Sequence, residues 1–438
     1  MKKITLFRQG IVMLSMLLLA ASLTFTGCGG SSDSYDEPSA AQTAPIAGQT
    51  QSVLIDAATL KGWVDSGLVN NDDDWEKVVI LDVTSATTYA AGHIPGAQLW
   101  AGNSGIDRFD GPVLSGNMVL DGAAMDAALQ SYGIDERTTV VFAGSGNPGR
   151  IYFMFRYWGF PKDRLKVLNG GKGAWTAAGY ALTPIAPDVE PSTYSVRDLS
   201  FNPNVRAALN EFIIGVENDT VAPVNTLVNN TDKAGGTTGI FDPSGDYVIF
   251  QGLIEGGVNV GYANFYEGGS TTAPLKSVDE LKTLLETNGV DGSKPIITYC
   301  RAGNAASYGF LPIDAALGWD VMVYDGSWSQ WGSLTNETEA AFVPDASYAL
   351  PALLSEWSTD VLVDQHKLEN DGAFFPGPYY NINLGLTIEK PTFRIVEGAL
   401  SPYDAGANSI EIEDREYFET LPEGGAPTSG SGGSGGGC

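Results

Sequence analysis

The stretch that decides the fold is Ile296-Ile297-Thr298-Tyr299-Cys300-Arg301-Ala302-Gly303-Asn304-Ala305-Ala306-Ser307. An apolar, β-branched run ends at Cys300, a loop with one glycine follows, and small residues then open a helix-like segment. The thiol is therefore expected where a strand passes into a helix. Loop N–H groups, the start of the helix and Arg301 can supply positive potential at the sulfur. The pattern indicates a reactive thiolate, with a small buried apolar side chain as the alternative.

Composition sets broad bounds on the function. The chain has 438 residues, 43% of them apolar, which allows two or three domains with real hydrophobic cores. Its 24 basic and 52 acidic residues give a formal net charge of −28. Such acidity argues against nucleic acid or anionic lipid surfaces as partners. It also slows the approach of anionic substrates, so a site that binds them needs local positive charge.

The N-terminus has the pattern of a lipoprotein signal peptide, predicted for residues 1–27. A basic start precedes an apolar run from Ile11 to Phe25, which is short for a transmembrane span. The small residues before Cys28 resemble the bacterial lipobox, which implies cleavage there and a diacylglycerol anchor on the Cys28 sulfur. Gly29 after Cys28 favours the outer membrane of the cell envelope as the location. An uncleaved anchor and simple secretion are the alternatives.

The two ends of the chain also limit the roles of its three cysteines. Residues 28–50 have the composition of a flexible tether, and residues 424–438 are a Gly/Ser tail that ends in Cys438. If Cys28 carries lipid, only Cys300 and Cys438 remain, which excludes a disulfide framework. A lone thiol in an exported protein suggests use, while a Cys300–Cys438 pair stays open.

From Val53 onward, strand-like and helix-like segments alternate. Three runs have the apolar character of buried strands: Lys77–Val83, Thr139–Phe142 and Leu165–Leu168. Amphipathic stretches between them include Met125–Tyr132 and Arg150–Trp158. The alternation predicts a parallel sheet covered on both faces.

The same order returns about 150 residues later, which indicates an internal repeat of domain size. Its segments are the strand-like Asn225–Asn229, Pro295–Cys300 and Val321–Tyr324 and the helix-like Val278–Leu285 and Ala305–Leu317. A segment with several prolines joins the halves, and its piece Pro203–Gly215 is a candidate linker helix.

Three strings of residues carry a resemblance to a known family. The first half holds Gly92-His93-Ile94-Pro95-Gly96-Ala97 and later Gly170-Gly171-Lys172-Gly173-Ala174-Trp175. The second half holds Asp325-Gly326-Ser327-Trp328 after the Cys300 loop. In this order and spacing, the region from Val53 to Gly332 resembles a tandem rhodanese of the thiosulfate and 3-mercaptopyruvate sulfurtransferase family.

The resemblance implies an α/β fold with two rhodanese-like, doubly wound domains built on central parallel sheets. Residues 51–185 would form a non-catalytic first domain, 186–222 a linker, and 223–335 the second domain with the Cys300 loop. A C-terminal extension, 336–423, follows. We expect it to pack across the two domains, with recognition of a partner as the alternative.

The resemblance also implies a function. Cys300 would accept sulfane sulfur as a persulfide and pass it to a thiol or cyanide. The implied substrate-binding residues are Arg301, Ala302, Gly303, Asn304, Ala305 and Ala306. The first-half loop, Phe142–Arg150, carries no thiol. No metal or organic cofactor is required, and the expected partners are small sulfur or selenium compounds, a thiol acceptor and the membrane through the lipid anchor.

Several positions depart from the family pattern. Ala302 and Ala305 lack side-chain donors that relatives often carry there. Thr231 stands near a position where Arg is common, which leaves Arg301 as the obvious cation beside Cys300. Two other functions therefore stay open. One is binding or uptake of selenite, tellurite or related oxyanions at the cell envelope without sulfur transfer, and the other is a structural lipoprotein that uses the rhodanese pair as a scaffold.

A few other side chains have two interpretations each. For His93 we expect a hydrogen bond that supports the fold instead of a catalytic role. Asp325 either orients the Cys300 loop or substrate, or shapes a turn. Trp328 and Trp331 either wall the pocket or fill the core.

Overall fold

The computed structural model describes residues 52–73, 76–101, 105–110, 113–227, 253–254, 256–327, 330, 368–369 and 408–420. The chain divides into two compact units, residues 1–47 and 48–438, and every described residue belongs to the second. The predicted signal peptide and tether, Cys28, Thr231, Trp328, Trp331 and the Cys438 tail lie outside the described residues. Within the described part, none of the helices is long and apolar enough to cross a membrane.

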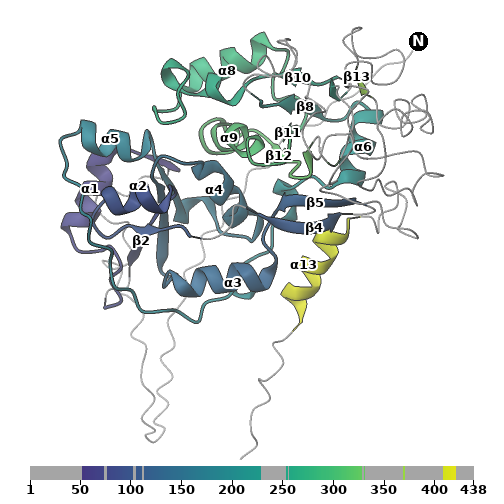
Figure 1. Cartoon of the computed structure of the whole chain (residues 1–438). Helices are drawn as coiled ribbons and strands as arrows, with labels where there is room; N and C mark the ends of the chain where they lie inside the picture. The colour runs from purple at the N-terminus through teal and green to yellow at the C-terminus, as the bar shows by residue number, and fades with distance from the viewer. Residues whose placement is uncertain are drawn as a thin grey trace, which may run out of the picture. The chain divides into compact units, whose positions relative to one another are not determined.

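The first half of the described chain builds a five-stranded sheet (Figure 1). Its strands lie in the order β1 (Leu54–Ile55), β7 (Leu165–Leu168), β6 (Thr138–Ala143), β2 (Lys77–Asp82) and β3 (Gln98–Leu99). Every pairing in it is parallel. All residues of β2 and β6 are buried, as expected for strands covered on both faces. The helices of this half are α1 (Ala57–Asp65), α2 (Ala86–Ala91), α3 (Gly122–Ser131), α4 (Pro148–Tyr157) and α5 (Gly171–Ala177).

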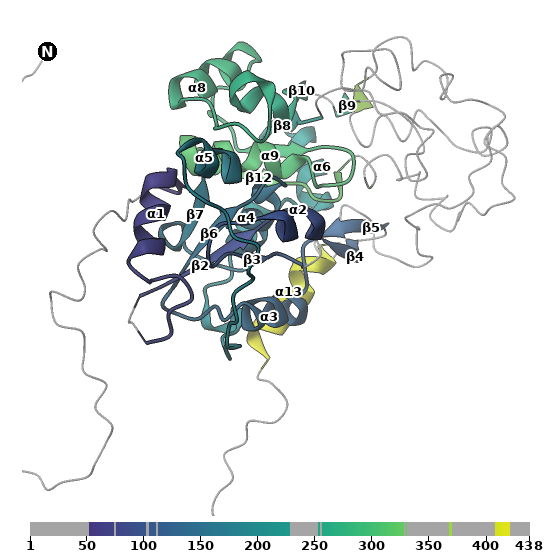
Figure 2. The same cartoon turned by 60° about the vertical axis from the view of Figure 1, so that its left-hand side comes forward.

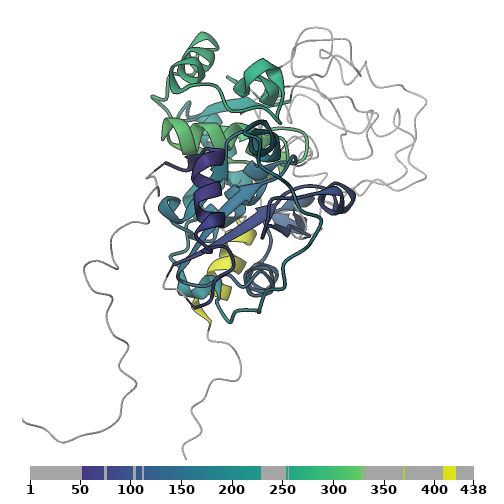
Figure 3. The same cartoon turned by 90° about the vertical axis from the view of Figure 1, so that its left-hand side faces the viewer.

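The second half builds a four-stranded parallel sheet of the same kind. Its strands lie in the order β10 (Val258–Asn259), β8 (Ala222–Asn225), β11 (Ile296–Tyr299) and β12 (Val321–Val323). Its helices are α6 (Leu209–Glu217), α8 (Val278–Thr287) and α9 (Ala306–Leu311), which continues as the π-helical turn η6 (Pro312–Leu317). Figures 2 and 3 show both halves from two other directions. The predicted α/β fold with two parallel sheets is confirmed.

Helix α4 differs from the amphipathic helix that the sequence predicts. It contacts β6 of the first sheet on one side and α9 of the second half on another. Phe153 of α4 packs edge-on against Phe310 of α9, with ring centroids 5.5 Å apart, and the hydroxyl of Tyr152 donates to Asp314 at 2.5 Å. Because the second half covers the face that would otherwise meet water, α4 is buried on nearly all sides.

Smaller elements complete the described chain. An antiparallel hairpin joins β4 (Ile106–Asp110) to β5 (Val113–Met118), and β9 (Leu253–Ile254) pairs with β13 (Leu368–Glu369). The short 3₁₀ helices are η1 (Lys162–Arg164), η2 (Val196–Asp198), η3 (Pro203–Val205), η4 (Tyr262–Phe265) and η5 (Glu267–Gly269). Helix α13 (Ser409–Glu419) lies beside the hairpin in Figure 1, drawn in yellow. With β13, it belongs to the predicted C-terminal extension.

His93 has the fold-supporting contacts that the sequence predicts, with a backbone carbonyl oxygen next to each ring nitrogen. Its ring is fully buried and stacks on Tyr89, with centroids 3.8 Å apart. Nδ1 lies 3.0 Å from the Tyr89 carbonyl oxygen, and Nε2 lies 3.0 Å from the Ile185 carbonyl oxygen. The imidazole thereby ties the end of α2 to the segment that leaves the first domain.

Candidate active site

Cys300 lies at the carboxyl end of a central strand. Strand β11 ends at Tyr299 and pairs with β8 on one side and β12 on the other. Cys300 follows directly, and the loop runs to Ala306, where α9 begins. The thiol is free and 2% exposed. This edge of a parallel sheet is where α/β proteins usually place their sites.

A serine that sequence reasoning did not single out stands next to the thiol. The Ser327 hydroxyl oxygen accepts hydrogen bonds from the backbone N–H groups of Cys300, at 3.1 Å, and Gly303, at 3.0 Å. The same oxygen lies 3.8 Å from Cys300 Sγ and 2.8 Å from the Tyr324 carbonyl oxygen. A hydroxyl has one proton to donate, so it donates either to Tyr324 or to the sulfur. These two loop N–H groups donate to Ser327 and not to the sulfur, so any positive potential that they supply at the sulfur is indirect.

Backbone contact holds the Cys300 loop against the turn that carries Ser327. Gly303 has a φ of 81°, and a Cβ added there would lie 2.2 Å from the Asp325 carbonyl oxygen. No side chain fits at that distance, so this loop position requires glycine. Ser327 itself has a φ of 50°, which is unusual for a residue other than glycine. The turn is therefore held in a left-handed conformation that places the hydroxyl under the loop.

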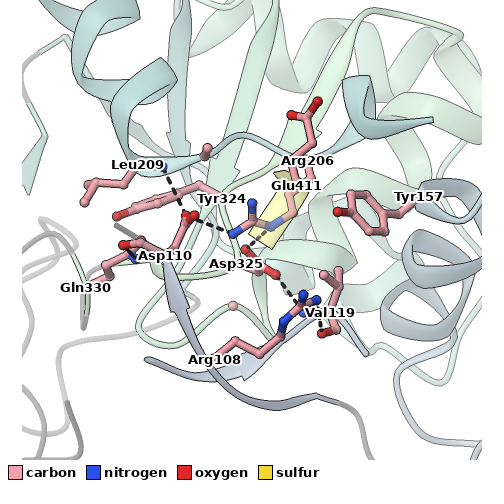
Figure 4. A network of polar contacts seen from close by, with 12 residues as sticks. Arg108, Asp110, Val119, Tyr157, Arg206, Leu209, Tyr324, Asp325, Gln330 and Glu411 are labelled. Carbon is pink, nitrogen blue, oxygen red and sulfur yellow. Dashed lines mark hydrogen bonds and ion pairs between the residues drawn. The ribbon is translucent and has the colours of Figure 1, made fainter. Parts of the chain in front are cut away.

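Asp325 belongs to a buried ionic network, shown in Figure 4. Its Oδ1 accepts from Arg206 Nε at 2.9 Å, and its Oδ2 accepts from the Val119 backbone N–H at 2.9 Å. Arg206 also donates through Nη2 to Asp110 at 2.9 Å. Burial raises the pKa of Asp110, whereas the attraction of Asp110 and Asp325 outweighs burial and raises the pKa of Arg206. Asp325 thus has a role beyond turn chemistry, because it fixes the strand end beside the Cys300 loop.

A second buried guanidinium comes from the first half of the chain. Arg150 of α4 is 1% exposed, and its Nη2 donates to the Asn117 carbonyl oxygen. Burial lowers the pKa of Arg150, while the negative charges of Asp325 and of the Cys300 thiolate raise it. Arg150 is therefore a further cation near Cys300, in addition to the predicted Arg301. Arg150 escaped sequence reasoning because only the packing of α4 on α9 brings it near the second-half loop.

The corresponding loop of the first half touches the Cys300 loop directly. Asn147 Nδ2 lies 2.8 Å from both the carbonyl oxygen and the side-chain oxygen of Asn304, and 3.1 Å from Ser307 Oγ. Two residues later, a Cβ added to Gly149 would lie 2.3 Å from the Ser307 carbonyl oxygen. The two halves thus meet at their matching loops.

The predicted substrate-binding residues lie together around this loop, but they are not equally accessible. Asn304 is exposed, and Arg301, Ala302 and Ala305 are partly exposed. Gly303 and Ala306 are buried. Among these six residues, the side chains open to solvent are therefore one cation, one amide and two methyl groups.

The comparisons with known proteins agree with this geometry. The family model described as Rhodanese-like domain matches residues 66–178 and again residues 227–334. The second match contains Cys300, and the first contains its counterpart loop.

Relatives and a solved structure extend over both halves. The chain is 32% identical over 267 residues to the sulfur carrier protein TtuD of Thermus thermophilus, a match that covers 59% of this chain and 89% of that one. It is 29% identical over 255 residues to the thiosulfate sulfurtransferase of Rattus norvegicus, covering 56% and 78% of the two chains. The crystal structure of the Tum1 protein from Saccharomyces cerevisiae has the same fold, with a TM-score of 0.52 and 18% identity over 64% of this chain and 95% of that one. The chain belongs to the rhodanese-like family and carries two copies of its domain.

Proposed function

We propose that the protein is a sulfurtransferase in which Cys300 carries sulfane sulfur as a persulfide and delivers it to a thiol or to cyanide. The observation that carries the proposal is the pairing of a buried free thiol with the Ser327 hydroxyl at the carboxyl end of β11. Relatives named as a sulfur carrier and as a thiosulfate sulfurtransferase support the same chemistry.

The transfer consists of two displacements at sulfur. The Cys300 thiolate attacks the outer sulfur of thiosulfate and forms a new S–S bond, while the S–S bond of thiosulfate breaks and sulfite leaves with the electron pair. A thiolate or cyanide then attacks the outer sulfur of the persulfide. The Cys300 thiolate leaves with the bonding pair and is ready for another cycle, so no external oxidant or reductant is consumed.

The residues around the sulfur suit its negative charge. The Ser327 hydroxyl can rotate away from the Tyr324 carbonyl and donate to Cys300 Sγ. The hydrogen bonds that its oxygen accepts from the Cys300 and Gly303 N–H groups keep that oxygen in place. Arg150 adds a buried positive charge. In this proposal Arg301, which is partly exposed, would meet an anionic donor. This local positive charge opposes the repulsion expected from a net charge of −28.

A turnover assay tests the proposal. Wild-type protein should form thiocyanate from thiosulfate and cyanide, and Cys300→Ser should lower that activity to the uncatalysed rate because it removes the only proposed nucleophile. Cys438→Ser is the matched control and should leave turnover unchanged. Turnover that survives Cys300→Ser overturns the mechanism. If the wild-type protein turns over no sulfur donor, a scaffold or a binding protein is the remaining function.

Binding of selenite or tellurite is the second candidate, favoured by the small side chains of the loop. Ala302 and Ala305 offer no side-chain donors to the oxygens of thiosulfate. A binding protein would take up selenium on the Cys300 peptide after exposure to selenite and yet form no thiocyanate from thiosulfate. Equal loading by sulfur donors would exclude this candidate.

The lipid anchor on Cys28 and a location at the outer membrane are a separate part of the proposal. The lipobox-like residues before Cys28 support both. Cells grown with labelled palmitate should transfer label to the wild-type chain and not to Cys28→Ser, and the wild-type chain should sediment with outer-membrane vesicles. A label that persists in Cys28→Ser would refute the anchor.

A further inference from the structure

Helix α13 is anchored deep in the first domain although it lies far beyond the family match, which ends at residue 334. Ile410 is fully buried and belongs to the common hydrophobic core, and Asp414 is 1% exposed. Near the other end of the helix, the Tyr417 hydroxyl donates to Asp126 of α3 at 2.6 Å. This part of the C-terminal extension is therefore a packed element of the first domain.

Asp414 holds the β4–β5 hairpin through Arg108. Arg108 Nη1 donates to Asp414 Oδ2 at 2.9 Å, and Nη2 donates to Oδ1 at 2.8 Å, which is the bidentate geometry of the strongest ion pairs. The Tyr157 hydroxyl of α4 donates to the same carboxylate at 2.7 Å. Arg108 and Tyr157 are both buried, so loss of the Asp414 charge leaves the Arg108 guanidinium with the exposed Glu413 carboxylate, 3.0 Å from Nη2, as its remaining ion-pair partner among the described residues.

The strand that carries Arg108 also carries a residue of the active-site network. Side chains two positions apart on a strand point to the same face, so Arg108 and Asp110 lie side by side on β4. Asp110 accepts from Arg206 at 2.9 Å and from the Leu209 backbone N–H at 3.3 Å. Figure 4 shows Arg108 and Asp110 on this strand, with Arg206 bridging Asp110 and Asp325.

Strand β5 of the hairpin and Val119, the residue after it, support the site by their backbone. The Asn117 carbonyl accepts from Arg150, and the Val119 N–H donates to Asp325 at 2.9 Å. Arg108 Nη1 reaches the Val119 carbonyl oxygen at 3.5 Å. The hairpin thus sits between Asp414 on one side and the buried groups that surround Cys300 on the other.

We propose that α13 is a positioning element of the active site: Asp414, through Arg108, fixes the β4–β5 hairpin, and the hairpin fixes Asp325 and Arg150 beside the Cys300 loop. Asp414 touches no substrate and acts only through this chain of contacts. The inference concerns the thiol environment of the proposed sulfurtransferase, and it can be tested without any sulfur transfer.

The test compares two variants of α13 in the full chain, Asp414→Asn and Tyr417→Phe. Each removes a polar contact between α13 and the first domain, but only Asp414 connects to the hairpin. The readout is the pH profile for alkylation of the Cys300 peptide by iodoacetamide, with unfolding by urea measured in parallel. Asp414→Asn should slow alkylation at neutral pH about tenfold and move the profile to higher pH, whereas Tyr417→Phe should stay within about twofold of wild type. Asp414→Glu should restore part of the rate.

The outcomes separate this inference from the proposed function. If both variants lose stability and alkylate at the same rate as wild type, α13 only covers the first domain and the inference is wrong. If Asp414→Asn alone slows alkylation but the wild-type protein forms no thiocyanate, the positioning role of Asp414 is supported and the proposed sulfur transfer is refuted. If Tyr417→Phe slows alkylation as much as Asp414→Asn, general loosening explains the effect and the inference fails.

Discussion

The two corresponding loops of the molecule differ in the residues that could carry chemistry. One runs from Ala143, the last residue of β6, to Pro148, the first residue of α4, and the other runs from Cys300 to Ala305 after β11. Each follows a fully buried central strand and leads into a helix that packs on the other half. Ala143 occupies the place of Cys300 in this correspondence. Absence of the thiol is thus the first difference between the two sites.

The second difference lies in the facing turn. In the first domain this turn contains Gly171, with a φ of 53°, and in the second it contains Ser327, with a φ of 50°. A Cβ on Gly171 would lie 2.1 Å from the Gly144 carbonyl oxygen. In the first domain the backbone of the loop therefore fills the space that the Ser327 hydroxyl occupies in the second domain. We therefore expect the proposed sulfur site to need the turn as well as the cysteine.

The largest effect is expected from moving the thiol. Cys300→Ser should lower sulfur transfer by at least about a thousandfold, and adding Ala143→Cys should not restore it, because the first-domain turn carries Gly171 where the second carries Ser327. Thiocyanate formation by the single and double variants is the measurement. Recovery of turnover in the double variant would show that the position of the thiol alone makes the site.

The next effect comes from making the second turn like the first. Ser327→Gly should reduce kcat/KM about tenfold to a hundredfold, since removing one hydrogen-bond donor to a developing negative charge has effects of this size or larger. Stability should change by only about 1 kcal/mol, because lost hydrogen bonds and relieved left-handed strain oppose each other. Ser327→Ala keeps the strain and serves as the matched control, with a similar loss of activity and lower stability in urea. Activity within twofold of wild type in both variants would remove Ser327 from the mechanism.

A smaller effect is expected where the loops touch. Asn147→Ala removes the contacts of Nδ2 with Asn304 and Ser307. Stability should fall by about 1 kcal/mol, and turnover should fall only severalfold because the thiol and Ser327 remain in place. Urea unfolding and thiocyanate assays on this variant give both numbers. A loss as large as that of Ser327→Gly would mean that the first-domain loop takes part in the chemistry.

The smallest effect concerns a carboxylate of the first domain remote from the thiol. Burial raises the pKa of Asp135, but hydrogen bonds from Arg137 at 2.8 Å and Thr138 at 2.9 Å outweigh it and lower the pKa below its ordinary value of 3.8. A lowered folded-state pKa stabilises the protein above pH 3.8, and this contribution disappears as the pH falls through the folded-state value. Asp135→Asn should therefore cost about 1 kcal/mol at pH 7 and less near pH 3. A cost that grows on acidification, or any change in turnover at pH 7, would contradict this assignment.

Local pattern predicted most of the fold and the place of the thiol. The apolar runs of β2, β6 and β11 are buried on both faces as parallel strands are, so their sequences alone identify them. Ser327, Arg150 and the partners of Asp325 were not predicted. Val119, Arg206 and Asp325 are distant in sequence and meet only in the packed chain. The amphipathic interpretation of α4 failed for the same reason, because a second domain covers its outer face.

The central claim is that Cys300 alone carries sulfur, and intact mass tests it most directly. The mass of the full chain is measured after incubation with thiosulfate and again after addition of cyanide, and peptide mapping covers Cys28, Cys300 and Cys438. If only the loop with Cys300 carries sulfur, the Cys300 peptide should gain the mass of one sulfur atom, and cyanide should then remove it. No gain with any sulfur donor, or a gain confined to the Cys438 peptide, would contradict the account.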